Sequence, residues 1–357
     1  MAKIEENKQS AKINLDLVGN FNGSNLISKA LETIVEKVDG VDLSQYTLDL
    51  EQEIPEPDCL LSISGTRTIP RGELVGIKGR PKCGKSQFAF FTEAAFMRDG
   101  RDIGPIRALH PGLKVVHADT EQSLASLATC ARRALRTIGM PVNKNADRLT
   151  YLHLRNSTPQ ERRDIISQAV EAHHPDVLII DGIRDLLTDF NDLSESADLI
   201  EWLLSLSSKY NLTIISVLHQ NQSTQDGKMR GHLGSELLNK LYDCFEVSVA
   251  DRRFKVKHTD SRGVTAPEIS FAIGGEGGGQ FVFLADTETA DIVAKCFAGA
   301  TEGLSNSALL ARYMTATGKS EPSFNRDLRK WVDQHLVTKG GRGRETRYFL
   351  GASLDFQ

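Results

Sequence analysis

The sequence predicts an α/β protein with a mostly parallel central sheet, preceded by a helical arm and followed by a small second domain. Two observations carry this prediction. Short apolar segments alternate with stretches long enough for helices from about residue 72 to 285, which is typical of a parallel sheet with helices on both faces. A separate set of helical and strand signals begins near residue 305.

The composition narrows the class of protein. The chain has 357 residues, 40% hydrophobic and 25% charged, as in a globular protein of about two domains. Collagen-like, disordered and disulfide-stapled chains are excluded. No apolar run approaches the roughly 18 residues of a membrane span, and residues 1–16 lack the apolar core of a secretory signal. The five cysteines form no CxxC pair, which favours reduced thiols in the cytoplasm over a zinc site.

We divide the chain into four parts. Residues 1–58 form an N-terminal arm, in which apolar residues at three- and four-residue spacing predict an amphipathic helix over 25–38. This helix either packs on its own domain or docks on a neighbouring subunit. An acidic, proline-containing linker ends the arm at residues 51–58. The other parts are a core, a second linker and a C-terminal domain: residues 59–285, 286–304 and 305–357.

The core elements follow in order. Five apolar segments predict parallel strands: residues 74–77, 113–119, 149–154, 176–181 and 212–218. Thr158 and Glu161 form a capping box at the start of one helix. Four later segments predict antiparallel strands that extend the sheet at one edge, with glycines 274–279 as a hairpin turn: residues 245–250, 254–258, 268–273 and 281–285.

A P-loop is the most specific motif. Gly79 to Ser86 reads GRPKCGKS, which matches GxxxxGK[ST] between an apolar segment and a helical one. Glycines let backbone N–H groups surround phosphates, and the next helix presents its positive end to them. Lys85 is expected to reach the β- and γ-phosphates, and Ser86 to ligate Mg²⁺. The predicted nucleotide-binding residues are Gly79, Arg80, Pro81, Lys82, Cys83, Gly84, Lys85, Ser86 and Gln87.

A carboxylate is needed near the magnesium ion, at the end of an adjacent buried strand. Asp181 meets this need because it follows four apolar residues, about 100 residues after the P-loop, at the end of a strand where α/β sheets bind ligands. We therefore predict Asp181 as a second magnesium ligand beside Ser86.

Hydrolysis also needs a group that deprotonates or orients water. Glu121, just after the apolar segment 113–119, is the predicted base, although it could instead cap the next helix. Asp119 is expected to hold a loop or a water. His219 and Gln220, after the segment 212–218, are candidate sensors of the γ-phosphate.

The polar loop after this segment, residues 223–234, would line the centre of a ring. There Lys228 and Arg230 could contact a nucleic-acid backbone.

These motifs, with GKMRGHLGSELLNK and FKVKHTDSRG at residues 227–240 and 254–263, resemble the RecA-like ATPases. More closely, they resemble the RepA-type hexameric helicases of plasmids and mobilizable elements. The resemblance covers about residues 60–285 and implies a RecA-like P-loop core, a hexamer and Glu121 as the base. It also implies ATP sites between subunits, each completed in trans by Lys257 and Arg262 at the end of a late strand, although these two could instead be surface residues of a hairpin. The arm and the C-terminal domain lie outside it.

The C-terminal domain is locally basic. A helix is predicted from Ser305 to Met314 and a second from about Ser323 to Leu336, followed by two strand-like pieces at residues 336–338 and 347–350. Two helices and a basic hairpin resemble a winged helix, a DNA-binding variant of helix-turn-helix, although such domains also bind proteins. The candidate DNA contacts are Asn325, Arg326, Arg329, Lys330, Arg342, Arg344 and Arg347.

The sequence thus predicts an ATP- and Mg²⁺-dependent, homo-oligomeric motor in the cytoplasm, with no membrane partner. Single-stranded DNA would pass through the core, and duplex DNA would bind the C-terminal domain. The process would be replication, mobilization or excision of a mobile element. The alternative is a non-motor initiator or regulator that uses ATP to control assembly. A small-molecule kinase would not explain the basic domain or the Lys257 and Arg262 pair.

Overall fold

The computed structural model describes residues 46–220, 231–250, 253–274, 279–284, 287–300, 302–333, 336–341 and 346–350. The helix predicted over 25–38 lies outside these residues. The chain divides into two compact units, Met1–Glu56 and Pro57–Gln357. Residues 46–58 are exposed, as expected for the predicted linker at 51–58.

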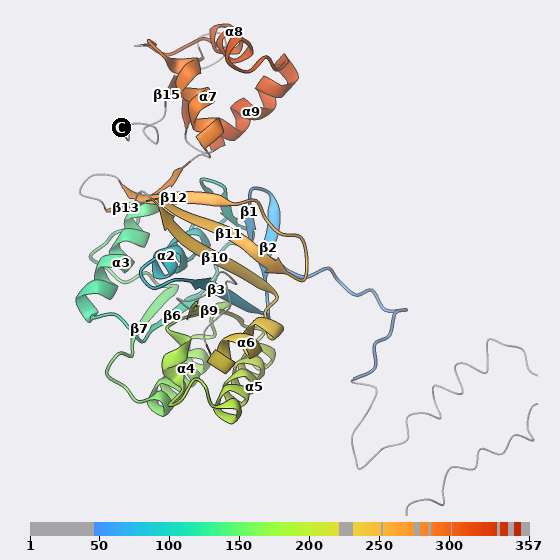
Figure 1. Cartoon of the computed structure of the whole chain (residues 1–357), viewed down its shortest axis with the longest axis vertical. Helices are drawn as coiled ribbons and strands as arrows, with labels where there is room; N and C mark the ends of the chain where they lie inside the picture. Colours follow the sequence, from blue (N-terminus) through green and yellow to red (C-terminus); the bar gives the residue numbers. More distant parts are fainter. Residues whose placement is uncertain are drawn as a thin grey trace, which may run out of the picture. The chain divides into compact units, whose positions relative to one another are not determined.

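The predicted α/β fold is confirmed. A nine-stranded sheet in the order β13-β12-β11-β10-β3-β9-β8-β6-β7 forms the core of the second unit (Figure 1). Its parallel strands are β3 (Leu74–Gly79), β6 (Val115–Asp119), β7 (Leu149–His153), β8 (Val177–Asp181), β9 (Thr213–His219) and β10 (Asp243–Ala250). Three of the four antiparallel strands predicted at one edge are present as β11 (Arg253–Ser261), β12 (Ile269–Gly274) and β13 (Gln280–Leu284). The fourth, predicted at residues 245–250, is instead β10, which pairs parallel to β3, and the change of direction comes between β10 and β11.

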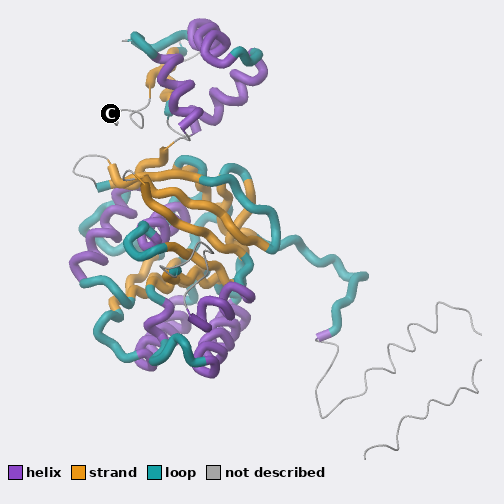
Figure 2. The backbone as a smooth tube through the Cα atoms, viewed as in Figure 1, coloured by secondary structure: helices purple, strands orange, loops and turns teal. Residues whose placement is uncertain are grey.

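Helices cover both faces of this sheet because its strands are apolar on both sides. In β8, Val177 and Ile179 belong to one core cluster, whereas Leu178 and Ile180 belong to the other. Helices α2 (Lys85–Phe96) and α3 (Leu124–Thr137) pack on the first side. Helices α4 (Pro159–His173), α5 (Leu193–Tyr210) and α6 (Gly231–Lys240) pack on the second (Figure 2). A short 3₁₀ helix, Ile183–Leu186, follows β8.

The predicted capping box at the start of α4 is present. The Thr158 hydroxyl accepts a hydrogen bond from the Glu161 N–H at 3.3 Å. The Glu161 carboxylate accepts one from the Thr158 N–H at 2.7 Å. Two N–H groups that the helix cannot satisfy internally are therefore paired.

A small antiparallel sheet was not predicted. Its strands are β1 (Cys59–Ile63), β2 (Thr66–Pro70), β4 (Asp102–Ile103) and β5 (Ile106–Ala108), in the order β2-β1-β5-β4. Leu60, Leu61 and Ile63 of β1 are buried in the same cluster as α2, so this sheet extends the core on the α2 side.

The C-terminal module, which we define as residues 287–350, has a cluster of its own. It contains α7 (Thr287–Phe297), α8 (Asn306–Thr317), α9 (Glu321–Asp333), β14 (Val337–Gly340) and β15 (Arg347–Leu350). The two predicted helices and two strands are present as α8, α9, β14 and β15. The stretch expected to be a linker, residues 286–304, instead holds α7, and Val293, Cys296 and Phe297 are buried with Tyr313 and Trp331.

The composition also led to expectations about membrane spans and cysteines. None of the described helices is long and apolar enough to span a bilayer. All five cysteines are free and buried. Burial raises the pKa of Cys244 to about 12 and that of Cys296 to about 11, so these thiols stay protonated near neutral pH.

Candidate nucleotide site

The P-loop lies between β3 and α2, as predicted. β3 is buried along its whole length and ends at Gly79, and α2 begins at Lys85. The loop between them is exposed at its tip, residues 80–82, and buried at Cys83. The free N–H groups at the start of α2 and its helix dipole therefore face an exposed loop, the arrangement that binds phosphate.

Gly84 is required where the loop meets the helix. It has a left-handed φ of 98°, and a Cβ atom there would collide with the ring of Phe254 from β11. The side chain of Gln87, predicted to bind nucleotide, turns away to α3: Arg133 donates to its Oε1 at 2.6 Å. Any contact of Gln87 with a phosphate would have to use its backbone.

Lys85 contacts the end of another strand through His219. Its Nζ is 3.0 Å from the carbonyl oxygen of Arg80 and 3.1 Å from Nδ1 of His219, at the end of β9. Nε2 of the same imidazole is 3.2 Å from Oε1 of Glu121, just after β6. Because an ammonium group can only donate, Nδ1 accepts and Nε2 carries the hydrogen donated to Glu121. His219 thus links the P-loop lysine to the predicted base.

The charges of this group suit proton transfer. Burial lowers the pKa of Lys85, and the negative charges of Glu121 and Asp181 partly oppose that shift. The hydrogen bond from His219 is the main reason that the pKa of Glu121 is lowered. Glu121 is therefore ionised at neutral pH and able to accept a proton from water.

The turn that carries Glu121 is fixed by its neighbours. Asp119 Oδ1 accepts hydrogen bonds from the N–H groups of Glu121 at 3.0 Å and Gln122 at 2.7 Å, so Asp119 holds the loop as expected. The N-cap of α3 is Ser123. Glu121 therefore does not cap that helix, and the alternative reading of this residue is wrong.

Asp181 ends β8, as predicted, but its strand is not adjacent to that of the P-loop. β9 lies between β3 and β8. Asp181 nevertheless lies close enough to the P-loop for the Ser86 side chain to lower its pKa. Burial is the largest effect and raises the pKa of Asp181 to about 6, while His117 and Ser86 oppose the shift.

Ser86 and Asp181 therefore present oxygen ligands side by side at the start of α2, a donor set that fits Mg²⁺. When bound there, the ion would neutralise charge on the phosphates. The two side chains would hold it between the helix and β8.

The late strand does not bring Lys257 and Arg262 to the P-loop of its own chain. Lys257 is opposite Glu246, which pairs with Lys78 beside the P-loop. It thus lies in the middle of β11, not at its end as predicted. Arg262 follows the end of β11, at the opposite end of the sheet, and its guanidinium is 3.4 Å from the Asn239 carbonyl oxygen. Both side chains are exposed.

The other predicted residues are placed as follows. Gln220 is buried, and its N–H donates to the Gly79 carbonyl at 3.0 Å, which ties the end of β9 to the P-loop. Asn325, Arg326, Arg329 and Lys330 are exposed on α9, and Arg347 donates to the Gly303 carbonyl at 2.8 Å. Lys228, Arg230, Arg342 and Arg344 lie outside the described residues.

Sequence reasoning missed several residues. Thr120 Oγ1 donates to the carbonyl groups of Asp181 and Gly182 at 3.0 and 3.1 Å, which locks the end of β6 to that of β8. Gly182 has a φ of 99°, and a Cβ atom there would collide with Thr120. His117 and Glu93 are fully buried. The sequence did signal them, as polar or acidic residues inside the apolar segments VVHAD and FFTEAAF.

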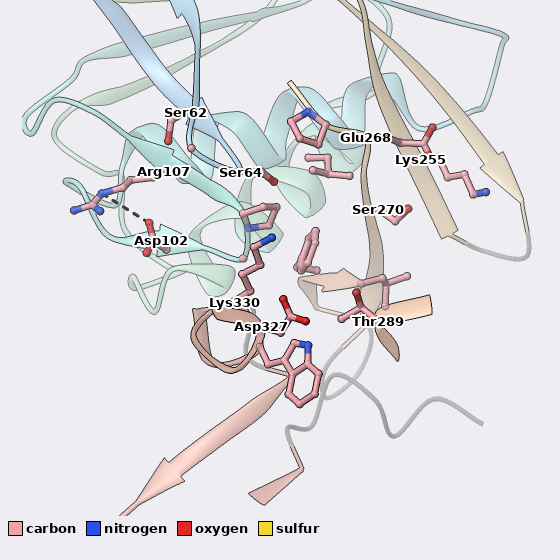
Figure 3. Close-up of a pocket in the computed structure, with 18 of the residues that line it drawn as sticks. Ser62, Ser64, Asp102, Arg107, Lys255, Glu268, Ser270, Thr289, Asp327 and Lys330 are labelled. Carbon is pink, nitrogen blue, oxygen red and sulfur yellow. Dashed lines mark ion pairs between the residues drawn. The ribbon is translucent and has the colours of Figure 1, made fainter. Parts of the chain in front are cut away.

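A pocket elsewhere in the second unit does not belong to this site. Figure 3 shows Ser62, Asp102, Arg107 and Lys255 among its lining residues, with an ion pair between Arg107 and Asp102. None of residues 79–87 lines it.

Comparison with known proteins identifies the family. Residues 41–225 match the family described as AAA domain, which is more than half of the 357 residues. The chain belongs to the AAA domain family. Its structure is similar to that of the flagellar accessory protein FlaH from Methanocaldococcus jannaschii, with a TM-score of 0.44 and 16% identity over 62% of this chain and 92% of that chain. No curated protein has a significant sequence match.

The AAA domain match includes the residues that meet around Lys85, since Glu121, Asp181 and His219 all lie within it. The late strands and the C-terminal module lie beyond it. Membership of the AAA domain family and the P-loop together indicate a nucleotide-binding ATPase domain.

Proposed function

We propose that this protein is an ATP-hydrolysing DNA motor of the RecA-like kind, which assembles into a hexameric ring and acts in replication, mobilization or excision of a mobile element. The observation that carries the proposal is the contact of Glu121 with His219 and of His219 with Lys85. An ionised carboxylate beside the P-loop lysine is what activation of water for attack on a γ-phosphate requires.

The exposed face of α9 supports a role on DNA. Phe324, Leu328 and Trp331 are buried in the module, and the opposite face presents Arg326, Arg329 and other polar side chains. A helix with one apolar and one basic face fits a domain that packs inward and contacts phosphates outward. We propose that the C-terminal module is a winged helix that binds duplex DNA. Lys228 and Arg230 would contact a single strand in the ring.

The exposure of Lys257 and Arg262 supports their proposed role in trans. Neither reaches the P-loop of its own chain, and a cation from a neighbouring subunit stabilises transition-state charge in many P-loop enzymes. The ATP sites of the ring would then lie between subunits.

ATP hydrolysis and unwinding of a forked duplex test the proposal together. We expect ATPase activity that single-stranded DNA stimulates, a hexamer by native mass spectrometry with ATP, and strand separation. Glu121→Gln should bind ATP normally but lower kcat by about 10²–10⁴-fold. Slow hydrolysis without unwinding would show the alternative, an initiator that uses ATP to assemble. Wild-type kcat in Glu121→Gln would exclude it as the base.

The salt dependence of duplex binding tests the role of α9. Arg329→Ala should reduce the slope of log affinity against log salt by about one, as expected for one lost phosphate contact. Lys144→Ala is the matched control, because Lys144 is an exposed cation of the core. Equal slopes for Arg329→Ala and the wild type would argue that α9 binds protein instead.

A further inference from the structure

A second group of ligand atoms lies beneath the nucleotide site, on the α2 side of the sheet. His117 and Asp119 are two residues apart on β6, so their side chains share a face. Asp119 pairs in register with Asp181 on β8. One ligand atom from each of His117, Asp119 and Asp181 lies within 4.8 Å of the others. We call these three residues the His117 cluster.

Two atoms of the cluster are buried without a partner. Nε2 of His117 and Oδ2 of Asp181 are both inaccessible and make no hydrogen bond to any described residue. Unpaired buried polar atoms are costly and uncommon. The other buried histidine of the sheet, His258, differs: its Nδ1 accepts from the Ala266 N–H at 2.9 Å, and its Nε2 is 3.0 Å from Asp243.

The tautomer of His117 is set by Glu93. Its Nδ1 is 2.8 Å from the Glu93 carboxylate, which can only accept and therefore fixes the hydrogen on Nδ1. Tyr151 donates to the other oxygen of Glu93. In the neutral imidazole the lone pair is on Nε2, directed away from Glu93, and a metal ion that binds there takes the place of the Nε2 proton. A carboxylate behind a histidine is the usual support of a metal-ligating imidazole.

The charge of this region also favours a cation. Glu93, Asp119 and Asp181 are each at most 2% exposed, and burying carboxylates together is costly unless their charge is compensated. Asp119 accepts from two backbone N–H groups at Oδ1 and from the Gln122 amide at Oδ2. A carboxylate has about four acceptor positions, so one remains for a metal.

We propose that His117, Asp119 and Asp181 bind a divalent first-row transition-metal ion, distinct from the magnesium expected at Ser86. One imidazole nitrogen with two carboxylates favours Mn²⁺, Fe²⁺ or Zn²⁺ over Mg²⁺ and Ca²⁺, which prefer oxygen ligands alone. The ion joins the ends of β6 and β8, where Asp119 also accepts a hydrogen bond from the N–H of Glu121. Asp181 is shared with the expected magnesium site, but binding of this ion requires no nucleotide, because its other two ligands, His117 and Asp119, lie outside the P-loop.

Mn²⁺ binding to the full-length protein without nucleotide tests the site. The chelator-treated protein should bind one Mn²⁺ per chain, measured by the loss of the free-ion EPR signal. Pulsed EPR should show coupling of the bound ion to a ¹⁴N nucleus. In protein labelled with ¹⁵N-histidine, a ¹⁵N coupling should replace it. No binding, or bound Mn²⁺ without histidine nitrogen coupling, overturns the proposal. The wild-type measurement decides this even if a variant fails to fold.

Variants assign the nitrogen to His117. His117→Asn keeps a donor for Glu93 but removes Nε2, so the coupling should vanish. Glu93→Gln should weaken Mn²⁺ affinity about 10–100-fold, as loss of a supporting carboxylate does elsewhere. His258→Asn, a change at a histidine with both nitrogens paired, should leave Mn²⁺ affinity unchanged. Coupling that persists in His117→Asn would contradict the assignment.

Discussion

At the scale of single residues, His219 joins two groups that the sequence separates by 36 positions. Lys85 and Glu121 follow different strands of the sheet, and the imidazole lies between them at 3.1 and 3.2 Å. Lys85 has three N–H donors, and the Arg80 carbonyl and His219 use two of them, so one remains for a phosphate. His219 is thus placed to position the base and to respond to the P-loop lysine.

Removing this imidazole should change the pH dependence of hydrolysis. The hydrogen bond from His219 is the largest cause of the lowered pKa of Glu121, and the base must be ionised to act. In His219→Ala that pKa rises toward its ordinary value, so the acid limb of the kcat/KM profile should move to higher pH. The measurement is steady-state ATPase activity from pH 4 to 8.

His153→Ala is the control for this experiment. It removes an imidazole at the end of β7, where Nε2 is 3.0 Å from the Gln122 carbonyl oxygen, and should leave the acid limb in place. If His219→Ala lowered kcat while its acid limb matched the wild type, the imidazole would not control the ionisation of Glu121.

At the scale of elements, the capping box at the start of α4 should make a measurable contribution to the free energy of unfolding. The Thr158 hydroxyl satisfies a backbone N–H that the helix leaves unpaired. Thr158→Ala should lower the free energy of unfolding by about 1 kcal/mol, measured by urea denaturation. In Thr129→Ala the lost hydroxyl donates to the carbonyl of Ala125 within α3, so no loss is expected. Equal losses in both variants would mean that capping is not the cause.

Elements with a strong local pattern could be predicted from the sequence, and long-range pairing could not. Each buried strand and the P-loop are marked by a sequence pattern that is complete within about ten residues. That β9 lies between β3 and β8 depends on contacts across the whole core, so the prediction that the strand of Asp181 is adjacent to that of the P-loop is wrong. β4 has two residues and β5 three, too few for any alternation to indicate them.

The candidate site divides in the same way. Lys85, Ser86, Glu121 and Asp181 stand at the ends of recognisable elements, and sequence reasoning found them. The bridge through His219 and the His117 cluster could not be found, because each depends on side chains that meet only when β6, β8 and β9 lie next to one another. α7 was missed because its buried residues, Val293, Cys296 and Phe297, are too few to show a clear period.

At the scale of the whole molecule, the proposed assembly predicts complementation between defective subunits. Arg262→Ala should bind ATP normally and hydrolyse it slowly. Mixed with Glu121→Gln subunits, it should recover part of the activity, since some interfaces then pair an intact base with an intact arginine. ATPase activity of mixtures, with mixed assemblies confirmed by native mass spectrometry, is the measurement. Absence of recovery in confirmed mixtures would reject a role in trans.

The final prediction concerns where the C-terminal module can be removed. The two core clusters contain no residue after Phe281 among their buried members, and the module cluster begins at Val293. The domain boundary predicted from the sequence would truncate the chain before residue 305, and the truncated protein would still contain α7. Its Val293 and Cys296 are 0% exposed and its Phe297 6% exposed, and that apolar surface would lose its partners α8 and α9.

A chain that ends at residue 304 should therefore aggregate or bind a hydrophobic dye, because it exposes a helix face that was buried. A chain that ends at residue 285 removes this face and should remain soluble, with the P-loop, Glu121 and Asp181 intact. Both should lose duplex affinity, and only the shorter should bind ATP as a monodisperse protein in size-exclusion chromatography. Equal solubility and dye binding of the two truncations would show that α7 does not depend on the module for its burial.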